Sequence, residues 1–472
     1  MVATCQFVLL VSKEDQHEAS VIDMTFSSST NTRPPWRTEP DPDLDRQNFL
    51  TACLATQPDI KQNIYPFKGI KLTRADIEWL LITHENGRGP IDWSDEQQRK
   101  RLGLDLRGAD LRQLNLRNLP LARMRGGLTR DEWQLATLEQ RDMAGVHLEG
   151  ATLSEAHLEG ATLEGAHMGR ATLRRVHMEE VNLFRASLKN TYLRQAHLEQ
   201  ANLRGTQLEG AYLFEAHLEG ADLRNAFFDS ATNLERITLG EKKFGFAQLA
   251  DVHWGDVNLS VVNWASMKRL GDEHRARQRE IVRGTRTVGE KAKRLEDYSA
   301  AVRANRQLAN TMRAQGMNEE AVRYAYRAQT LQRKVLWRQV LWGRVESLPP
   351  DMVPGRLQLA VQELWLRARK FGGYIFSWFL DILAGYGYKP GRSVLIYLLM
   401  ILGFATCYHF IGHLSPSEAL IFSVTSFHGR GFLPGPFALG SPVTGLAALE
   451  AVIGLFIEIS FIATFTQRFF GR

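Results

Sequence analysis

The stretch AHLEGATLEGAHMGR, residues 156–170, is one five-residue unit written three times, and it decides the fold. From Met143 to Phe228 every fifth residue is Leu, Met or Phe, which makes eighteen consecutive registers. A small or β-branched residue lies two positions before nearly every one of them. A period of five fits neither the 3.6-residue turn of a helix nor the two-residue alternation of a strand. The chain is therefore expected to turn a corner in every repeat.

This pattern resembles the pentapeptide-repeat family, whose unit is A(D/N)LXX. The resemblance implies a right-handed quadrilateral β-helix with four repeats in each coil and with the large and the small residue pointing inward. A shorter series in the same register predicts an earlier coil, formed around Leu106, Leu111, Leu116 and Leu121.

Two capping boxes predict helices beside the β-helix. Thr129 with Glu132 begins the segment 127–141, which interrupts the repeat and is expected to fold as a helical insertion. Thr73 with Asp76 begins a helix that we expect to cover the N-terminal end of the β-helix, because exposed strand edges need such covers.

A coil of twenty residues also stacks outward-facing side chains in columns. Histidines recur at this interval, and so do glutamates two residues further on; we call the two columns the His–Glu ladder. Its members are His157, His177, His197, His217, Glu159, Glu179, Glu199 and Glu219. Repelling carboxylates beside histidines would make the face responsive to pH. The alternative is a solvated surface that repeats because its unit was duplicated.

Length and charge indicate several architectures. The 472 residues correspond to about three domains. Residues 268–344 hold 19 Lys and Arg against 8 Asp and Glu, a net charge of +11, whereas residues 143–229 have a net charge of −4. The basic block precedes an apolar C-terminus, which favours anionic lipid over nucleic acid as its contact. Three scattered cysteines exclude a disulfide framework and indicate a reducing compartment.

Two apolar runs near the C-terminus, residues 393–411 and 443–465, are long enough to cross a bilayer. Lys and Arg flank the outer ends of this pair. The positive-inside rule then predicts a multi-pass protein of the inner membrane with both termini and the repeats in the cytoplasm.

The segment between these runs predicts a re-entrant pore loop. ALIFSVTS, residues 419–426, and LEAVIGLF, residues 449–456, resemble the two-transmembrane-helix channel family, the pore unit of bacterial potassium channels. The resemblance implies a tetramer and a gating hinge at Gly454. The TVGYG filter of that family is absent, and FHGRG, residues 427–431, stands in its place. A GYG at 385–387 precedes the first apolar run and therefore cannot be a filter.

The candidate ion pathway follows from this resemblance. It comprises Thr425, Ser426, Phe427, His428, Gly429, Arg430 and Gly431. If Arg430 faces the axis, its charge predicts an anion-selective pore. If it points backward, it needs a buried partner, for which Glu418 and Glu450 are available. Glu450, Gly454 and Glu458 share one helical face, and a ring of Glu458 would favour cations.

The fold class is thus a multidomain membrane protein: a right-handed quadrilateral β-helix, an α-helical hairpin connector and a C-terminal two-helix pore domain with a re-entrant loop. The expected divisions are a disordered tether 1–47, a helical cap 48–100, the repeats 101–250, a basic helical connector 251–350, interfacial amphipathic helices 351–392 and the pore domain 393–472. We expect no enzyme, cofactor or metal site, since the glycines at 284 and 289 lack the Lys-Ser/Thr of a phosphate loop.

The predicted function is an oligomeric ion channel, a weakly selective cation pathway whose partners are copies of itself, the lipid bilayer and inorganic ions. Nucleic acid is not expected as a partner. Two alternatives stay open: the anion-selective pore, and a membrane-anchored repeat scaffold that binds a cytoplasmic protein and conducts nothing.

Overall fold

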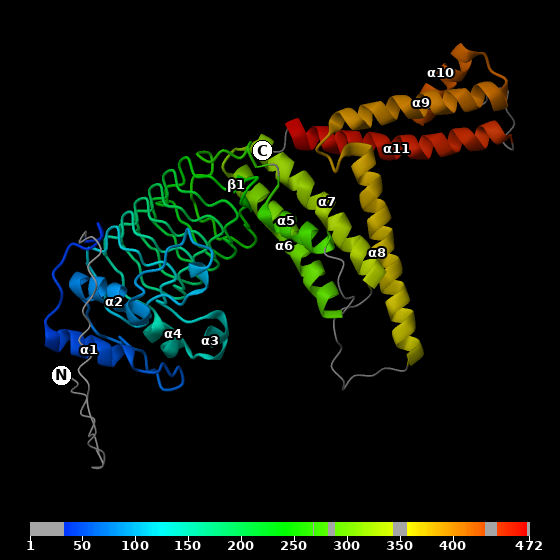
Figure 1. Ribbon diagram of the computed structural model, residues 1–472. Helices are drawn as coiled ribbons and strands as arrows, with labels where there is room; N and C mark the ends of the chain where they lie inside the picture. The colour runs from blue at the N-terminus through cyan, green and yellow to red at the C-terminus, as the bar shows by residue number, and fades with distance from the viewer. Residues whose placement is uncertain (1–32, 268, 282–287, 343–355, 430–440, 470–472) are drawn as a thin grey trace.

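Parallel pairing between residues twenty apart builds the centre of the molecule. The computed structural model describes residues 33–267, 269–281, 288–342, 356–429 and 441–469. Successive bridges join His157 to His177, Thr162 to Asn182, His167 to Ser187 and Thr172 to Tyr192. Each coil therefore holds four repeats of five residues, and the coils stack as a rod (Figure 1). The expected repeat β-helix is confirmed.

The pairing interval changes where the chain inserts extra elements. From Asp110 with His147 to Arg125 with Thr162 the interval is 37 residues, because α3 (Arg130–Leu135) and α4 (Leu138–Ala144) lie between the paired strands. It is 26 residues for Phe227 with His253, where the hairpin of β1 (Gly240–Glu241) and β2 (Gly245–Phe246) is inserted. The capping box of Thr129 and Glu132 is present, as the sequence predicts.

Leucine, methionine and alanine side chains fill the inside of the coils. Leu148, Leu153, Leu158 and their small partners are fully buried in one continuous core. Burial of each large side chain contributes about 1.5–3 kcal/mol, so contacts with the coils before and after it stabilise each coil. The core continues past Leu239 through Trp254 and Trp264, beyond the inserted hairpin that interrupts the five-residue register.

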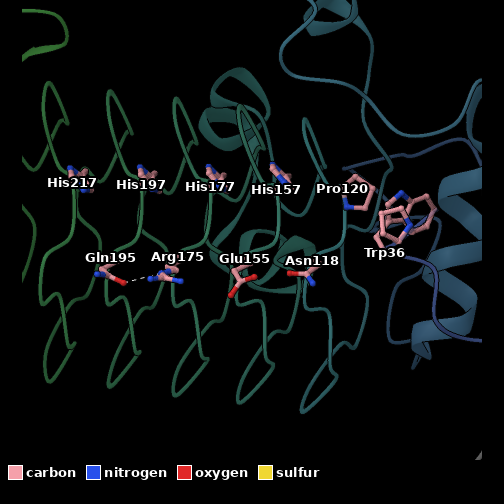
Figure 2. Close-up of a pocket in the computed structure, with 11 residues that line it drawn as sticks. Trp36, Asn118, Pro120, Glu155, His157, Arg175, His177, Gln195, His197 and His217 are labelled. Atoms are coloured by element: carbon pink, nitrogen blue, oxygen red, sulfur yellow. Dashed lines mark hydrogen bonds between the residues drawn. The ribbon is translucent and has the colours of Figure 1, made fainter.

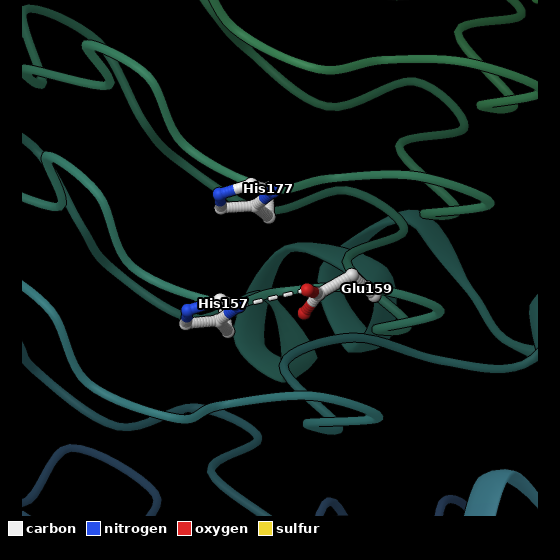
Figure 3. A group of neighbouring side chains, drawn as sticks. All are labelled: His157, Glu159 and His177. Atoms are coloured by element: carbon white, nitrogen blue, oxygen red, sulfur yellow. Dashed lines mark hydrogen bonds and ion pairs between the residues drawn. The ribbon is translucent and has the colours of Figure 1, made fainter. Parts of the chain in front are cut away.

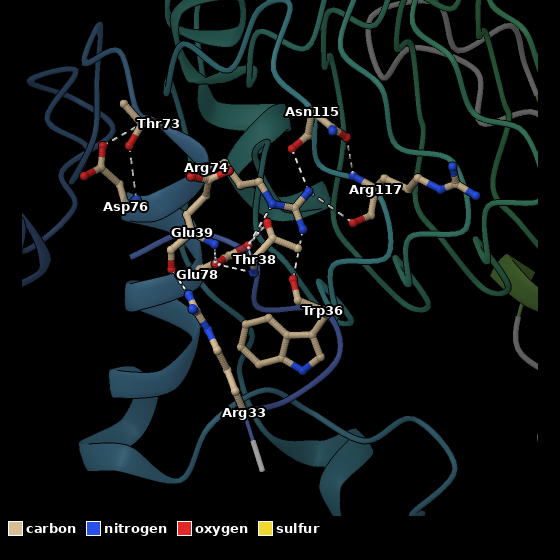
Figure 4. A network of polar contacts seen from close by, with 10 residues as sticks. All are labelled: Arg33, Trp36, Thr38, Glu39, Thr73, Arg74, Asp76, Glu78, Asn115 and Arg117. Carbon is tan, nitrogen blue, oxygen red and sulfur yellow. Dashed lines mark hydrogen bonds and ion pairs between the residues drawn. The ribbon is translucent and has the colours of Figure 1, made fainter. Parts of the chain in front are cut away.

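Helices α1 (Leu44–Leu54) and α2 (Arg74–Gly87) cover the N-terminal end of the rod, followed by the short 3₁₀ helix η1 (Gln98–Lys100). Thr73 and Asp76 form the predicted capping box of α2. Arg74 Nη1 donates to the carbonyl oxygens of Asn115 and Arg117 on the first coil at 2.9 and 3.2 Å (Figure 4). The helix thus satisfies backbone acceptors that the end of the rod would otherwise expose.

Residues 33–47 differ from the expected tether, because Glu78 and Arg74 of α2 hold them against the cap. The Glu78 carboxylate accepts hydrogen bonds from the backbone N–H groups of Thr38 and Glu39 at 2.9 Å each. Arg74 Nη2 donates to the Trp36 carbonyl oxygen (Figure 4). Charge-assisted bonds to backbone groups fix a segment whose composition alone predicts disorder.

Helices α5 (Gly271–Ile281), α6 (Val288–Ala314) and α7 (Asn318–Trp342) cover the other end. Ala304, Leu308 and Met312 of α6 join the core of the rod. The Gln315 side chain accepts from the Leu259 N–H and donates to the Val257 carbonyl oxygen at 2.9 and 2.7 Å. The predicted connector is therefore also the cover that satisfies the last strand edge.

The C-terminal unit consists of α8 (Arg356–Ala384), α9 (Pro390–Gly412), α10 (Pro416–Phe427) and α11 (Pro442–Phe469). Helix α8 runs beside α7 and leads to α9 and α11, which lie side by side (Figure 1). The segments Gly391–Gly412 and Pro442–Ile462 are long and apolar enough to cross a membrane, as predicted.

Candidate functional site

Helix α10 lies between the two long apolar helices and makes contact with both. Ser415 and Glu418 form its capping box, and Pro416 occupies the first turn, so the helix begins at a defined residue. Ala419, Ser423 and Phe427, spaced four apart on one face, are buried against α9 and α11. Local signals thus start α10, and one apolar stripe fixes its orientation.

Glu450 of α11 is fully buried and is held by two hydroxyl groups. Tyr408 Oη of α9 donates to Glu450 Oε2 at 2.6 Å, and Ser423 Oγ of α10 lies 2.5 Å from Oε1. One carboxylate therefore ties together all three helices. Sequence analysis identified Glu450, but the hydroxyl partners lie 42 and 27 residues away and have no local signature.

A second polar cluster lies at the C-terminal end of α10. His428, the capping residue, pairs through Nδ1 with the carboxylate of Glu458 on α11. Its Nε2 lies 3.3 Å from Tyr397 Oη of α9. Both members of the His428–Glu458 pair are about a third exposed in the single chain, at 39% and 35% of the side-chain surface. The pair is thus open on one side, unlike the sealed Glu450.

Gly454 permits the close approach of α10 and α11. A Cβ atom at this position would lie 2.1 Å from the carbonyl oxygen of Phe427, closer than any contact a side chain can make. The glycine is therefore required for packing at the end of α10. A hinge role for it stays a prediction.

The remaining predicted site residues have varied positions. Thr425 Oγ1 bonds to backbone carbonyls of its own helix, Ser426 is buried, and Gly429 has φ of +68° directly after the helix. Glu418 closes the capping box by accepting a hydrogen bond from the Ser415 N–H at 3.0 Å. Arg430 and Gly431 lie outside the described residues. Glu418 and Glu450, the two carboxylates proposed to pair with Arg430, thus both have partners of their own.

Asp381 links the C-terminal unit to the rod. Its carboxylate on α8 bonds to Arg333 Nη1 and Tyr326 Oη of α7 at 2.7 and 2.9 Å, and lies 3.3 Å from Arg392 Nη1 of α9. The GYG at 385–387 forms the corner between α8 and α9, where all three residues have positive φ.

The His–Glu ladder forms along one face of the rod, but Glu159, Glu199 and Glu219 are buried and not outward-facing as predicted. The rings of His157, His177, His197 and His217 stack nearly parallel at centroid distances of 4.7 to 5.0 Å (Figure 2). Each histidine faces the glutamate of its own coil through Nδ1, at 2.8 Å for His157 and Glu159 (Figure 3). A groove of about 860 Å³ follows this column, with Trp36 and Pro120 at one end.

The carboxylates change the electrostatics of the histidines. Hydrogen bonding to Glu159 raises the pKa of His157, and Glu179 and Glu219 raise the pKa of His177 and His217 in the same way. The second carboxylate oxygen of each ladder glutamate is buried and has no hydrogen-bond partner among the described residues. The ladder therefore combines imidazole nitrogens with carboxylate oxygens that still lack a donor.

Comparison with known proteins identifies the repeats. The family of pentapeptide repeats matches eight copies, over residues 134–170, 165–200 and 191–229. No curated protein matches the chain. This segment is a pentapeptide-repeat domain, and the family match ends before the C-terminal helices begin.

Solved structures of pentapeptide repeat proteins match part of this chain. One from the thylakoid lumen of Arabidopsis thaliana is 22% identical over 19% of this chain and 63% of its own, less than two thirds, with a TM-score of 0.19. One from the cyanobacterium Cyanothece 51142 is 27% identical over 34% of this chain and 93% of its own, with a TM-score of 0.19. HetL of Nostoc, a protein involved in heterocyst differentiation regulation, is 28% identical over 34% of this chain and 69% of its own, with a TM-score of 0.14.

Proposed function

We propose that this chain assembles around a central axis as an ion channel of the inner membrane, with its pentapeptide-repeat domain in the cytoplasm for assembly or regulation. The observation that carries the proposal is the course of α10. It begins where α9 has ended and brings His428 to Glu458, sixteen residues into α11. At about 1.5 Å per residue, this point lies roughly 24 Å along α11 from Pro442. Helix α10 itself has 12 residues, a length of about 18 Å, or somewhat more than half of a hydrocarbon core of about 30 Å.

The chain leaves helical structure at that depth. Phe427 is the last residue of α10, and Gly429 already has a left-handed backbone. Within a bilayer, irregular backbone is tolerated only where protein buries it or where it lines a water-filled cavity. The pair of His428 and Glu458, about a third exposed, is polar enough to border such a cavity.

The two intramembrane carboxylates have different roles in this proposal. Glu450 is sealed inside one chain by Tyr408 and Ser423, so it anchors α10 and does not meet ions. Glu458 has an open side, and a ring of such carboxylates around an axis attracts cations. The proposed pathway is therefore a weakly selective one for cations. The alternative, in which Arg430 faces the axis, would select anions.

Several subunits are needed, because two crossing helices cannot enclose a pore. The outer faces of α9 and α11 expose Leu398, Leu402, Val452 and Phe456 to about half of their surface or more, which offers area for lipid and for other subunits. Four subunits are the number implied by the resemblance to two-helix channels. Neither catalysis nor a cofactor is part of this proposal.

Reconstitution of the full chain in liposomes under a KCl gradient tests the proposal. We expect ion flux with a reversal potential toward that of potassium, and an oligomer by native mass spectrometry. Glu458→Gln should move the reversal potential toward zero, because the carboxylate charge at the pathway is lost. The matched control is Glu235→Gln, the same change at an exposed residue of the repeat domain.

Two results would count against the proposal. A solitary chain without flux would leave the membrane-anchored scaffold as the function. A reversal potential toward that of chloride would reject the cation pathway in favour of an Arg430-lined anion pore.

A further inference from the structure

The His–Glu ladder provides metal-binding side chains at a regular spacing. In each coil the histidine Nδ1 and the glutamate Oε1 lie 2.8 to 3.5 Å apart, as measured for His157–Glu159, His177–Glu179, His197–Glu199 and His217–Glu219. Two ligands about 2.1 Å from a tetrahedral zinc ion are roughly 3.4 Å apart. Each pair therefore already has the separation of a chelating pair.

A third ligand comes from the neighbouring coil. Three groups have all their ligand atoms within 4.8 Å of one another: His157 with Glu159 and His177, Glu179 with His197 and Glu199, and Glu199 with His217 and Glu219. Every group spans two coils, as Figure 3 shows for His157, Glu159 and His177. Glu199 belongs to two groups, to which it can offer one oxygen each. A small inward movement of the third ligand would complete three-coordinate protein binding, with water as a fourth ligand.

The unpaired carboxylate oxygens are the second reason for a site. The side chains of Glu159, Glu199 and Glu219 are more than nine-tenths buried, at 5%, 8% and 6% exposure. Their Oε2 atoms nevertheless have no hydrogen-bond partner among the described residues. A buried oxygen without a donor costs about 1–3 kcal/mol, and a bound cation would remove that cost. The histidine rings beside them are about a third to a half exposed, so an ion can enter from solvent.

We infer that the His–Glu ladder of the repeat domain binds divalent transition-metal ions of the zinc type, held between consecutive coils by imidazole nitrogen and carboxylate oxygen. Imidazole ligands suit zinc, copper and nickel, whereas magnesium and calcium prefer oxygen alone. Each ion would take the position of the proton that Nδ1 now shares with its glutamate. The inference concerns the repeat domain alone and does not depend on ion conduction.

The opposite face supplies a matched control. His147 and Glu149 occupy the same repeat positions ten residues, or half a coil, away, and their side chains lie 3.3 Å apart. His147 stacks on His167 at 4.8 Å, much like the ladder rings. Among the described residues, however, His147 belongs to no group of three ligands. His147 therefore has a paired glutamate and a stacked histidine ring, but it has no third ligand among the described residues.

Zinc binding to the full chain in detergent tests the inference, with a purification tag free of histidine. Competition with a chromogenic zinc indicator should reveal two or three ions per chain, unaffected by millimolar magnesium. His177→Gln and the isosteric Glu199→Gln should each lose at least one ion or weaken its binding about tenfold, whereas His147→Gln should bind as the unaltered chain does. X-ray absorption should detect nitrogen ligands of imidazole type.

A variant with Gln at all four ladder histidines measures binding elsewhere in the chain. Equal zinc uptake by this variant and the unaltered protein would overturn the inference, and so would an equal loss in His147→Gln and His177→Gln. Zinc should also raise the unfolding temperature of the unaltered chain but not of the four-histidine variant, since an ion between coils stabilises the folded rod. Circular dichroism in the absence of metal confirms that each variant folds.

Discussion

The contacts of Glu450 lead to a prediction at the scale of single residues. Tyr408→Phe and Ser423→Ala each remove one of the two hydroxyl groups that form hydrogen bonds with the fully buried carboxyl group of Glu450. Each should lower the free energy of unfolding by about 1–3 kcal/mol, because a buried oxygen loses its donor. Denaturant unfolding in detergent would measure the loss.

The control for this prediction is Thr406→Val on the same helix. Thr406 is exposed, and its hydroxyl bonds only to the Leu402 carbonyl oxygen of the preceding turn. We expect a change below about 0.5 kcal/mol there. If Tyr408→Phe cost no more than this control, Glu450 would not be the anchor of α10.

Asp272 makes the end of the rod sensitive to pH. It is almost wholly buried and accepts a hydrogen bond from the Leu249 N–H at 2.6 Å. Burial raises its pKa from 3.8 to about 7. The folded chain therefore keeps a proton that the unfolded chain releases between those values, and stability falls as pH rises through this window.

Asp272→Asn should remove that dependence. At about 1.4 kcal/mol per pKa unit, the unaltered chain should lose roughly 3 kcal/mol more than the variant between pH 5 and pH 8. Hydrogen exchange of the Leu249 amide at the two pH values would measure this difference. Parallel pH profiles for the two proteins would contradict the assigned protonation.

Two glycines of the coils allow a comparison at the scale of elements. Gly165 and Gly150 both have left-handed backbones, with φ of +69° and +68°. A Cβ at Gly165 would lie 2.8 Å from the Trp133 ring of α3, whereas at Gly150 the nearest atom is 3.6 Å away. Both alanine variants therefore have the conformational cost of about 1–2 kcal/mol, and only Gly165→Ala should also displace α3.

Hydrogen exchange over residues 127–144 would separate the two effects. We expect faster exchange there in Gly165→Ala and an unchanged rate in Gly150→Ala, with similar overall destabilisation of the coils. Equal exchange in both variants would mean that α3 does not depend on its contact with this turn.

Local sequence determined most of the elements. The five-residue period specifies coils because each repeat is bonded to the one twenty residues away, and the capping boxes at Thr73 and Thr129 start helices where predicted. The last coils could not be followed beyond Leu239, because the inserted β-hairpin shifts the pairing interval to 26 residues. After the hairpin the five-residue spacing resumes, because Leu249, Trp254, Leu259 and Trp264 are five apart and all lie in the core.

Only part of the candidate site could be predicted, because its contacts join residues that are far apart in the sequence. The order of apolar run, short capped helix and apolar run is visible in the sequence, and so are the carboxylates of α11. The packing of three helices determines which hydroxyl groups contact Glu450. The same packing places Gly454 against the Phe427 carbonyl. Such contacts join residues tens of positions apart and leave no periodic trace.

At the scale of the whole molecule, Asp381 connects the rod and its covering helices to the apolar helices. Asp381→Asn removes the negative charge that forms ion pairs with both Arg333 and Arg392. We expect roughly tenfold faster hydrogen exchange in α7 and α8, since a hydrogen bond to a charged group contributes about 1.5–3 kcal/mol. The melting of the coils should not change, because their core does not include this residue.

The control for this coupling is Glu319→Gln, which removes a carboxylate from the first turn of α7 without touching α8. If Asp381→Asn left exchange unchanged, the two halves would be joined by other contacts, such as the Trp337 and Tyr374 rings at 4.9 Å.

The fixed twenty-residue coil has a consequence for the evolution of this chain. Duplication or deletion of four repeats would change the height of the column by one layer, about 4.8 Å, and leave the azimuth of both ends as before. Gain or loss of a single repeat would instead turn the C-terminal end by a quarter turn relative to the N-terminal end, although contacts within each end, such as Arg303 with Asp251 and Arg74 with Asn115, would persist. Homologues of different height should therefore vary in multiples of four repeats.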